Sequence, residues 1–253
     1  MSRITIALLA VLACLSFDVH ADAITGKAGL GLSYQPHDPS GSRYETRPVP
    51  YLDLDWGDVS LGTDDGLTWN AFKADGFSAG PFFGYLPGRT ANGTLRGLRD
   101  VPDMGEVGAF VQYAPADFWR VFASVGQALG GGSGQGGVLG RVGGEVGYPL
   151  GGGVIGSSNL TAHFVDARQN RTFFGVSADE SLASGIRPAN ASGGLQNVAL
   201  TQSFELPLAS HWSLLTSVSW IHLTGSAADS SLVKELGHSD QGAVQAAIAY
   251  AFN

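Results

Sequence analysis

Apolar residues alternate with small or polar residues along much of the chain, and the final segment shows this most clearly. Successive side chains of a β-strand point to opposite faces, so this alternation predicts strands with one apolar and one polar face. The apolar face of the final segment comprises Val244, Ala246, Ile248, Tyr250 and Phe252. The other face carries alanines and Gln245. The pattern therefore predicts a last strand that closes on an aromatic residue.

The segment from His211 to Leu223 has the same arrangement and adds a spatial clue. Its apolar face comprises Trp212, Leu214, Thr216, Val218 and Trp220, opposite Ser213, Ser217 and Ser219. At about 3.3 Å per residue and a tilt near 40°, the two tryptophans stand about 20 Å apart along a membrane normal. That spacing is close to the distance between the aromatic girdles of a membrane barrel. A strand of a soluble sandwich alternates in the same way, so this alternative stays open.

Further segments alternate likewise, at residues 28–34, 119–126, 138–148 and 197–206. Their polar faces include four charged side chains, those of Arg120, Arg141, Glu145 and Glu205. Charges on these faces favour a water-filled lumen over the ordinary solvent surface of a sandwich. We therefore predict an all-β fold, an antiparallel transmembrane β-barrel of about 12 strands, with these four side chains in the lumen. The strand boundaries near residues 57 to 76 are the least defined.

The start of the chain has the features of a targeting segment. Arg3 precedes an almost unbroken apolar stretch from Ile4 to Phe17, and Val19-His20-Ala21 offers small residues to a signal peptidase. The stretch is shorter than the roughly 20 residues of a spanning helix, which argues against a membrane anchor. A lipoprotein cleavage box at Val11 to Cys14 is the remaining alternative. We predict a cleaved signal peptide at residues 1–21 and a barrel at residues 22–253.

Composition narrows the possibilities further. After residue 21 no apolar stretch is long enough for a spanning helix, so a membrane protein of this sequence has to be a closed barrel. The content of 37 glycines and 11 prolines also disfavours helices. The net charge of −8 without a basic cluster argues against nucleic-acid binding. Cleavage after Ala21 removes Cys14, the single cysteine, and with it any disulfide or thiolate metal site.

An even strand number with both chain ends in the periplasm predicts which loops face outward. Counting strands back from Phe252 places four loops outside, namely Thr224 to Gln241, Asp179 to Gly194, Pro149 to Ser157 and Gln35 to Pro48. The same count places Pro87 to Gly105 in the periplasm. That segment is long for a periplasmic turn, so it either has a function there or the count is wrong by one strand.

The segment from Pro87 to Glu106 is the most charge-dense part of the chain. Its charged residues are Arg89, Arg96, Arg99, Asp100, Asp103 and Glu106. A solvated loop explains such a run of charges. A periplasmic partner-binding surface also explains it, because arginines suit bidentate contacts with carboxylates.

The sequence contains no arrangement that predicts catalysis. It has no G-x-S-x-G motif, and His211 and His222 lie at the two ends of one predicted strand, too far apart to cooperate. Residues 132–137 match G-x-G-x-x-G, but alternating strand residues follow where a dinucleotide site needs a helix. The acidic turns at Asp64-Asp65-Gly66 and Asp229 lack the spacing of a calcium loop. We predict no catalytic residue, no metal site and no cofactor.

Several segments together resemble the MipA/OmpV family of MltA-interacting proteins, in the order in which the family has them. The matching segments are residues 29–34 (GLGLSY), 44–51 (YETRPVPY), 88–89 (GR), 95–100 (LRGLRD), 106–110 (EVGAF), 173–176 (FFGV) and 223–231 (LTGSAADSS). The chain departs from the family in having Ser231 where proline is usual and in ending with Asn253 instead of phenylalanine. The family has no agreed catalytic residues, so none is carried over.

The resemblance implies a barrel surrounded by outer-membrane lipid. For the best-known relative it also implies a scaffold that brings a lytic transglycosylase together with a murein synthase, while other relatives resemble adhesins or small-solute channels. Our leading hypothesis is a non-enzymatic scaffold for murein-remodelling enzymes that acts through periplasmic loops. A narrow channel or uptake porin, suggested by the charged polar faces, and an adhesin are the alternatives.

Overall fold

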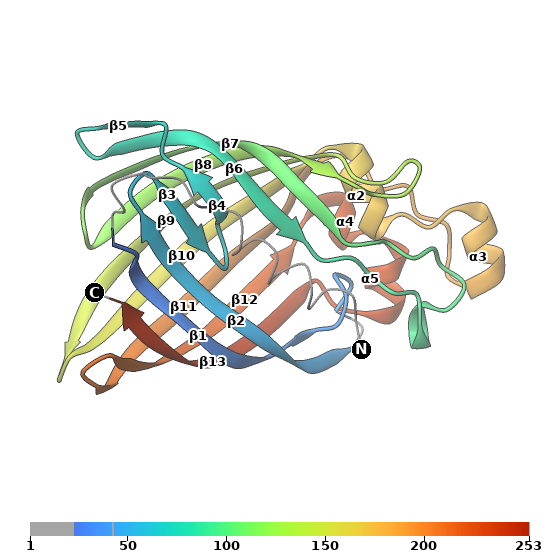
Figure 1. Ribbon diagram of the computed structural model, residues 1–253. Helices are drawn as coiled ribbons and strands as arrows, with labels where there is room; N and C mark the ends of the chain where they lie inside the picture. The colour runs from blue at the N-terminus through green and yellow to red at the C-terminus, as the bar shows by residue number, and fades with distance from the viewer. Residues whose placement is uncertain (1–22, 42, 253) are drawn as a thin grey trace.

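The chain forms a closed antiparallel β-barrel in the computed structural model, which describes residues 23–41 and 43–252 (Figure 1). The strands are β1 (Thr25–Pro36), β2 (Tyr44–Trp56), β3 (Val59–Gly62), β4 (Gly66–Trp69), β5 (Phe72–Ala74), β6 (Phe77–Leu86), β7 (Met104–Ala116), β8 (Trp119–Leu129), β9 (Val138–Gly151), β10 (Val154–Val165), β11 (Gly194–Ala209), β12 (Trp212–Leu223) and β13 (Asp240–Phe252). The predicted signal peptide lies outside the described residues.

The barrel closes where β4 pairs with β6. Apart from β4 and β5, all strands that are consecutive in the chain pair with each other. In addition, β1 pairs with β13, from Gly26 opposite Phe252 to Tyr34 opposite Val244. The short strands β4 and β5 both pair with β6, one after the other, so they fill a single place in the wall. The closed wall therefore has 12 strands, which confirms the prediction from the alternation.

The apolar surface of this fold is on the outside. In β13, Val244 and Ile248 are 52% and 43% exposed, whereas Ala247 and Ala249 on the alternate face are buried. Large exposed apolar side chains recur at alternate positions of the other long strands, as in β1 at Leu30, Leu32 and Tyr34. A barrel in lipid requires this apolar outer band, whereas a soluble protein would bury it. The sandwich alternative is therefore wrong.

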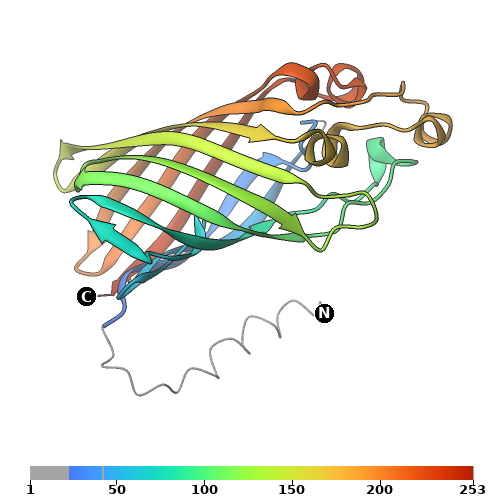
Figure 2. The same cartoon turned by 90° about the horizontal axis from the view of Figure 1, so that it is seen from above.

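The two ends of the barrel differ. The end that carries Thr25 and Phe252, here called the terminal rim, has only short turns, such as residues 57–58, 75–76, 117–118 and 210–211. The opposite end, the outer end, carries the longer loops with η1 (Gly93–Leu95), α2 (Ala167–Phe174), α3 (Ala178–Ser184), α4 (Gly225–Ala228) and α5 (Ser231–Leu236) (Figures 1 and 2). Short turns face the periplasm and long loops face outward in barrels of this type.

Two loop predictions are wrong. Residues Pro87 to Gly105 lie at the outer end, and the turn within Pro149 to Ser157 lies at the terminal rim. The predicted count required two strands between residues 157 and 179, but the structure has β10 followed by helix α2. Because the count was wrong by one strand, every loop between residues 76 and 157 was assigned to the wrong end of the barrel. The loop before residue 57 was assigned correctly, because the count was wrong by one strand again at residues 57–76, where β3 and the shared position of β4 and β5 lie. The loops after β1, β10 and β12 lie at the outer end, as predicted.

In the described part of the chain, no helix is long and apolar enough to cross a membrane.

Candidate functional site

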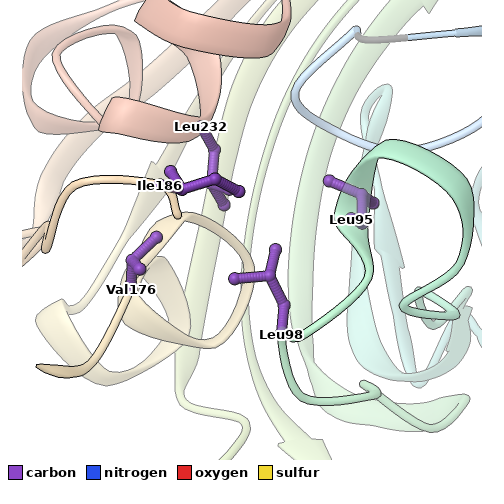
Figure 3. Close-up of a cluster of buried hydrophobic side chains, with 5 residues drawn as sticks. All are labelled: Leu95, Leu98, Val176, Ile186 and Leu232. Carbon is purple, nitrogen blue, oxygen red and sulfur yellow. The ribbon is translucent and has the colours of Figure 1, made fainter. Parts of the chain in front are cut away.

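The outer end carries a packed structure that we call the outer cap, formed by residues 87–103, 166–193 and 224–239. One apolar cluster joins all three segments and consists of Leu95, Leu98, Val176, Ile186 and Leu232 (Figure 3). Leu95 and Leu232 are completely buried. A second cluster around Phe174 and Val233 continues this core. Because these loops bury their apolar side chains against each other, they have a core of their own beside the barrel.

Two arginines of the charge-dense segment hold this cap together. Arg89 is buried, and its guanidinium donates hydrogen bonds to the carbonyl oxygens of Phe173 (2.6 Å) and Arg99 (3.3 Å). Arg99 donates from its guanidinium to the Glu180 carboxylate (2.7 Å) and to the Arg171 carbonyl oxygen (2.6 Å). Both side chains are thus engaged inside the cap.

Glu180 links the charge-dense segment to helix α3. Its carboxylate accepts hydrogen bonds from the backbone N–H groups of Arg99 and Ser177, both at 2.8 Å. Ser177 in return caps the helix N-terminus and completes a capping box with Glu180. Burial alone would raise the pKa of Glu180, but these hydrogen bonds and the positive charge of Arg99 outweigh it and hold the pKa below its ordinary value of 4.5.

The remaining charged residues of the segment do not form one group. Arg96 and Asp100 are exposed at the outer end. Asp100 and Asp103 accept backbone hydrogen bonds within their own loop, from Ala91 (2.7 Å) and Gly88 (2.8 Å). Glu106 belongs to β7 and lies over Gly126 of the inner wall, where a Cβ would stand 2.3 Å from its carboxylate. The structure therefore divides the predicted partner-binding residues between cap core, outer surface and lumen.

Inside the barrel, a cavity of about 610 Å³ extends from the guanidinium groups of Arg120 and Arg141 to the turn Asp75-Gly76 at the terminal rim. Its wall is mixed: Asp53, Asp55 and Lys73 contribute charge, whereas Phe82, Phe110 and Phe122 contribute apolar surface. We call this cavity the chamber. It reaches the terminal rim, while the outer cap lies at the opposite end of the barrel.

An ion-pair network crosses the lumen at the chamber wall. Arg120 contacts Glu145 at 2.9 Å and Asp65 at 3.1 Å, and Arg141 contacts Asp65 at 3.1 Å. Both guanidinium groups also lie near the ring of Phe122, at 5.2 and 6.0 Å from its centroid. Asp65 lies in the turn between β3 and β4, so two arginines on β8 and β9 hold the tip of this hairpin inside the barrel.

Of the four predicted lumen residues, Arg120, Arg141 and Glu145 meet in this network, whereas Glu205 lies elsewhere. Glu205 pairs with Lys27 at 2.5 Å and accepts a hydrogen bond from Ser213 at 2.9 Å. In the sequence, Asp65 has the features of an ordinary acidic turn, and nothing there predicts that both arginines converge on it. No local pattern marks it, because its partners lie on distant strands.

Among residues 23–41 and 43–252, no cluster of histidine, cysteine or acidic side chains has the geometry of a metal site.

A closed antiparallel barrel with an apolar outer band, aromatic residues near both edges and a charged lumen is an outer-membrane β-barrel protein. A family model described as MltA-interacting protein MipA matches residues 28–252, and the chain therefore belongs to this family. No curated protein matches the chain.

Solved outer-membrane proteins resemble the chain at low identity. The anion-selective porin from Comamonas acidovorans has 11% identity and a TM-score of 0.39, with 92% of this chain and 100% of that chain covered. The channel DcaP of Acinetobacter baumannii has 11% identity and a TM-score of 0.38, covering 93% and 99%. OprG from Pseudomonas aeruginosa has 13% identity and a TM-score of 0.28, covering 92% and 98%.

Proposed function

We propose that this protein is a non-enzymatic docking site for murein-remodelling enzymes at the inner face of the outer membrane. The observation that carries the proposal is the match over residues 28–252 to a family described as MltA-interacting. A lytic transglycosylase is the first expected partner, and a murein synthase is a further one. Such enzymes work in the periplasm, so the docking surface has to lie at the terminal rim.

The terminal rim offers one surface suited to this task, which we call the acidic arc. It consists of Asp58, Asp75, Asp117 and Phe118, which are all exposed and belong to successive turns along the same side of the barrel. Phe118 is 60% exposed beside Asp117. An exposed aromatic ring flanked by carboxylates suits a partner with a basic patch around an apolar pocket.

The test is binding of a purified lytic transglycosylase to the refolded barrel in nanodiscs. Replacing Asp117 by Asn and Phe118 by Ala should weaken binding by about tenfold or more, as expected for loss of a central aromatic anchor. The matched control carries Asp229→Asn and Leu182→Ala, which remove a carboxylate and an exposed apolar side chain at the outer end. This control should bind as the unaltered barrel does.

The same assay tests the charge-dense segment. A variant with Arg96, Arg99 and Asp100 changed to Ala should keep its binding, because these residues lie at the outer end. Loss of binding in this variant together with normal binding of the Asp117 and Phe118 variant would assign docking to the segment instead. Equal binding by all variants would reject both surfaces.

A small-solute channel is the second candidate, and the chamber with its ion-pair network favours it. The hairpin tip at Asp65 narrows the lumen, so removing its carboxylate should widen the path. Asp65→Ala should therefore raise the conductance of the barrel in a planar bilayer. A barrel that stays silent both with and without Asp65 would count against a channel.

A further inference from the structure

The wall of the barrel is incomplete on one side of β2. From Tyr44 to Leu52, β2 pairs with β1 on one edge, but its pairing with β3 begins only at Asp53. The hairpin of β3 and β4 is too short to accompany β2 toward the outer end. Within residues 23–41 and 43–252, the outer half of β2 therefore has a free edge.

Two prolines lie on this free edge. The amide of Leu52 donates to the hydroxyl of Thr63 (2.7 Å), and the Leu52 carbonyl accepts from the Thr63 amide (2.8 Å), so Leu52 directs its backbone groups toward the hairpin side. Every second residue of a strand points the same way, which places the nitrogens of Pro50 and Pro48 on that edge. Proline has no N–H, so Pro48 and Pro50 leave no unsatisfied donor at their two positions, whereas Thr46, in phase with them, keeps its N–H on this edge.

The opposite side of the gap is β6. Its pairing with β4 ends at Phe83, and beyond this point residues Gly84 to Leu86 pair only with β7. The hairpin closes the gap from below, because Gly66 packs so tightly on β6 that a Cβ would stand 2.3 Å from the Phe83 carbonyl oxygen. Figure 1 shows β2 and β6 running on toward the outer end past the short β3–β4 hairpin, and no described strand pairs with either facing edge there.

Next to the hairpin, apolar side chains frame this gap on both faces of the wall. Farther toward the outer end, the same inward face of β2 carries Arg47, which is paired with Glu45. Toward lipid, Phe83 and Tyr85 on β6 are 54% and 65% exposed. Asp53 and Phe82 both line the chamber, so their side chains point into the lumen. Every second residue of a strand points the same way, so Tyr51 and Val49 on β2 and Leu86 on β6 also face the lumen. The charged network of Asp65, Arg120 and Arg141 lies at the hairpin that forms the floor.

We propose that the space between β2 and β6 above the hairpin is a lateral portal, through which an acyl chain of a membrane lipid enters the lumen. The chain lies between Pro50 and Phe83 in the outer leaflet, and its end contacts Val49 and Phe82. Strand addition by a second copy is the competing use of a free edge, but Pro48 and Pro50 remove two of the donors that such pairing needs. The barrel thus has a lateral route from the bilayer to the lumen.

The test measures whether lipid chains reach the lumen beside the portal. The chain from residue 22 onward contains no cysteine, so a single introduced cysteine can carry a bimane fluorophore. The label is placed at Tyr51→Cys, beside the portal, or at Asn159→Cys on β10, whose side chain faces the lumen from a distant part of the wall. A label at Val218→Cys, which faces lipid, gives the reference for full contact. Each barrel is reconstituted in nanodiscs of dioleoyl or dibromostearoyl phosphatidylcholine, because bromine quenches only on contact.

We expect brominated chains to quench the label at position 51 nearly as strongly as at position 218, and to leave position 159 bright. Gly84→Leu should restore fluorescence at position 51, because a side chain there meets only Glu106 and Phe82 at ordinary contact distances and projects into the path. Gly140→Leu, on the outward face of β9, adds the same side chain away from the portal and should change nothing.

Unquenched fluorescence at position 51 would overturn the portal. Equal quenching at positions 51 and 159 would also overturn it, since lipid would then fill the lumen from one end. A mass corresponding to two copies, measured on the same nanodiscs, would show strand addition instead. Heat-modifiable gel migration of each variant establishes that the barrel has folded before the fluorescence is compared.

Discussion

The electrostatics of the outer cap depend on one buried carboxylate. Glu180 is 9% exposed and accepts three hydrogen bonds, two from backbone amides and one from the Arg99 guanidinium. A buried carboxylate is stable only with such partners, because losing them leaves a charge in a poorly solvated place. Arg99 is the partner that the charge-dense segment supplies, so this pair fastens residues 87–103 to helix α3.

This arrangement predicts that the cap loosens in acid. The folded-state pKa of Glu180 lies below its ordinary value of 4.5, so the unfolded cap takes up the proton more readily. The stabilisation is therefore fully present above that value and is lost as the pH falls through the folded-state pKa. The protection of residues 87–103 against hydrogen exchange, relative to the intrinsic exchange rate at each pH, should fall over this range in the unaltered protein.

Glu180→Gln should remove the pH dependence and cost about 1 to 3 kcal/mol of local stability at neutral pH, the usual loss for a hydrogen bond to a charged group. Glu235→Gln is the control, because its partner Arg187 is 75% exposed and such pairs contribute little. Protection in the Glu180→Gln variant that still falls in acid would assign the effect to another group.

At the scale of elements, the outer cap behaves as a small domain built from loops. Leu232 of α5 is completely buried against side chains of the two other cap segments. Leu232→Ala should destabilise the cap by about 2 to 5 kcal/mol, through lost burial and the cavity left behind. The expected result is faster hydrogen exchange across all three cap segments, with unchanged exchange in β8 to β13.

Leu182 on α3 provides the comparison, since it is 87% exposed. Leu182→Ala removes the same number of atoms and should change local stability by less than about 0.5 kcal/mol. If Leu232→Ala accelerated exchange only in α5, the three segments would be independent loops and the cap would not be a cooperative unit.

The elements differ in how far the sequence could predict them. Strands such as β12 and β13 were predictable because lipid on one side and lumen on the other impose a period of two on neighbouring residues. The outer cap was not predictable, because Leu95, Val176 and Leu232 are buried by contacts between segments that are distant in sequence. Their positions follow no regular spacing of apolar residues within one segment. The missed helix α2 then reversed the sidedness of the segment that contains Arg89 and Arg99.

The lumen shows the same limit. The alternation of apolar and polar residues was enough to predict that Arg120, Arg141 and Glu145 lie on the polar faces of their strands. Their common partner Asp65 comes from a turn whose position depends on the closure of the barrel, which no local pattern encodes. Sequence therefore predicted the faces of the strands, and closure determined which residues meet.

For the whole molecule, closure also depends on the seam between the first and last strands. Gly29 and Gly31 face Ala249 and Ala247 across this seam, and a Cβ at either glycine would stand 2.2 Å from a carbonyl oxygen of β13. At the terminal rim, the seam ends in aromatic contacts of Tyr250 with Trp212 and Phe252. The strands that are furthest apart in sequence are thus held by both close backbone approach and ring packing.

Ending the chain at Ala249 should prevent closure. The truncation removes the pairs that Gly26, Lys27 and Ala28 make with β13 and exposes backbone groups of β1 to lipid, where each unsatisfied group costs several kcal/mol. On gels, the unheated full-length protein from the outer-membrane fraction should run as a compact species that shifts on heating, and the truncated chain should show neither the shift nor membrane localisation. A chain lacking only Asn253 is the control and should behave like the full-length protein, since it keeps every pair between β1 and β13, including Gly26 with Phe252. If the truncated chain still shifted on heating, the pairing among β2 to β12 would be enough to keep the wall closed without the complete seam between β1 and β13. The fold would then tolerate missing pairs at this seam as it does at the free edge of β2.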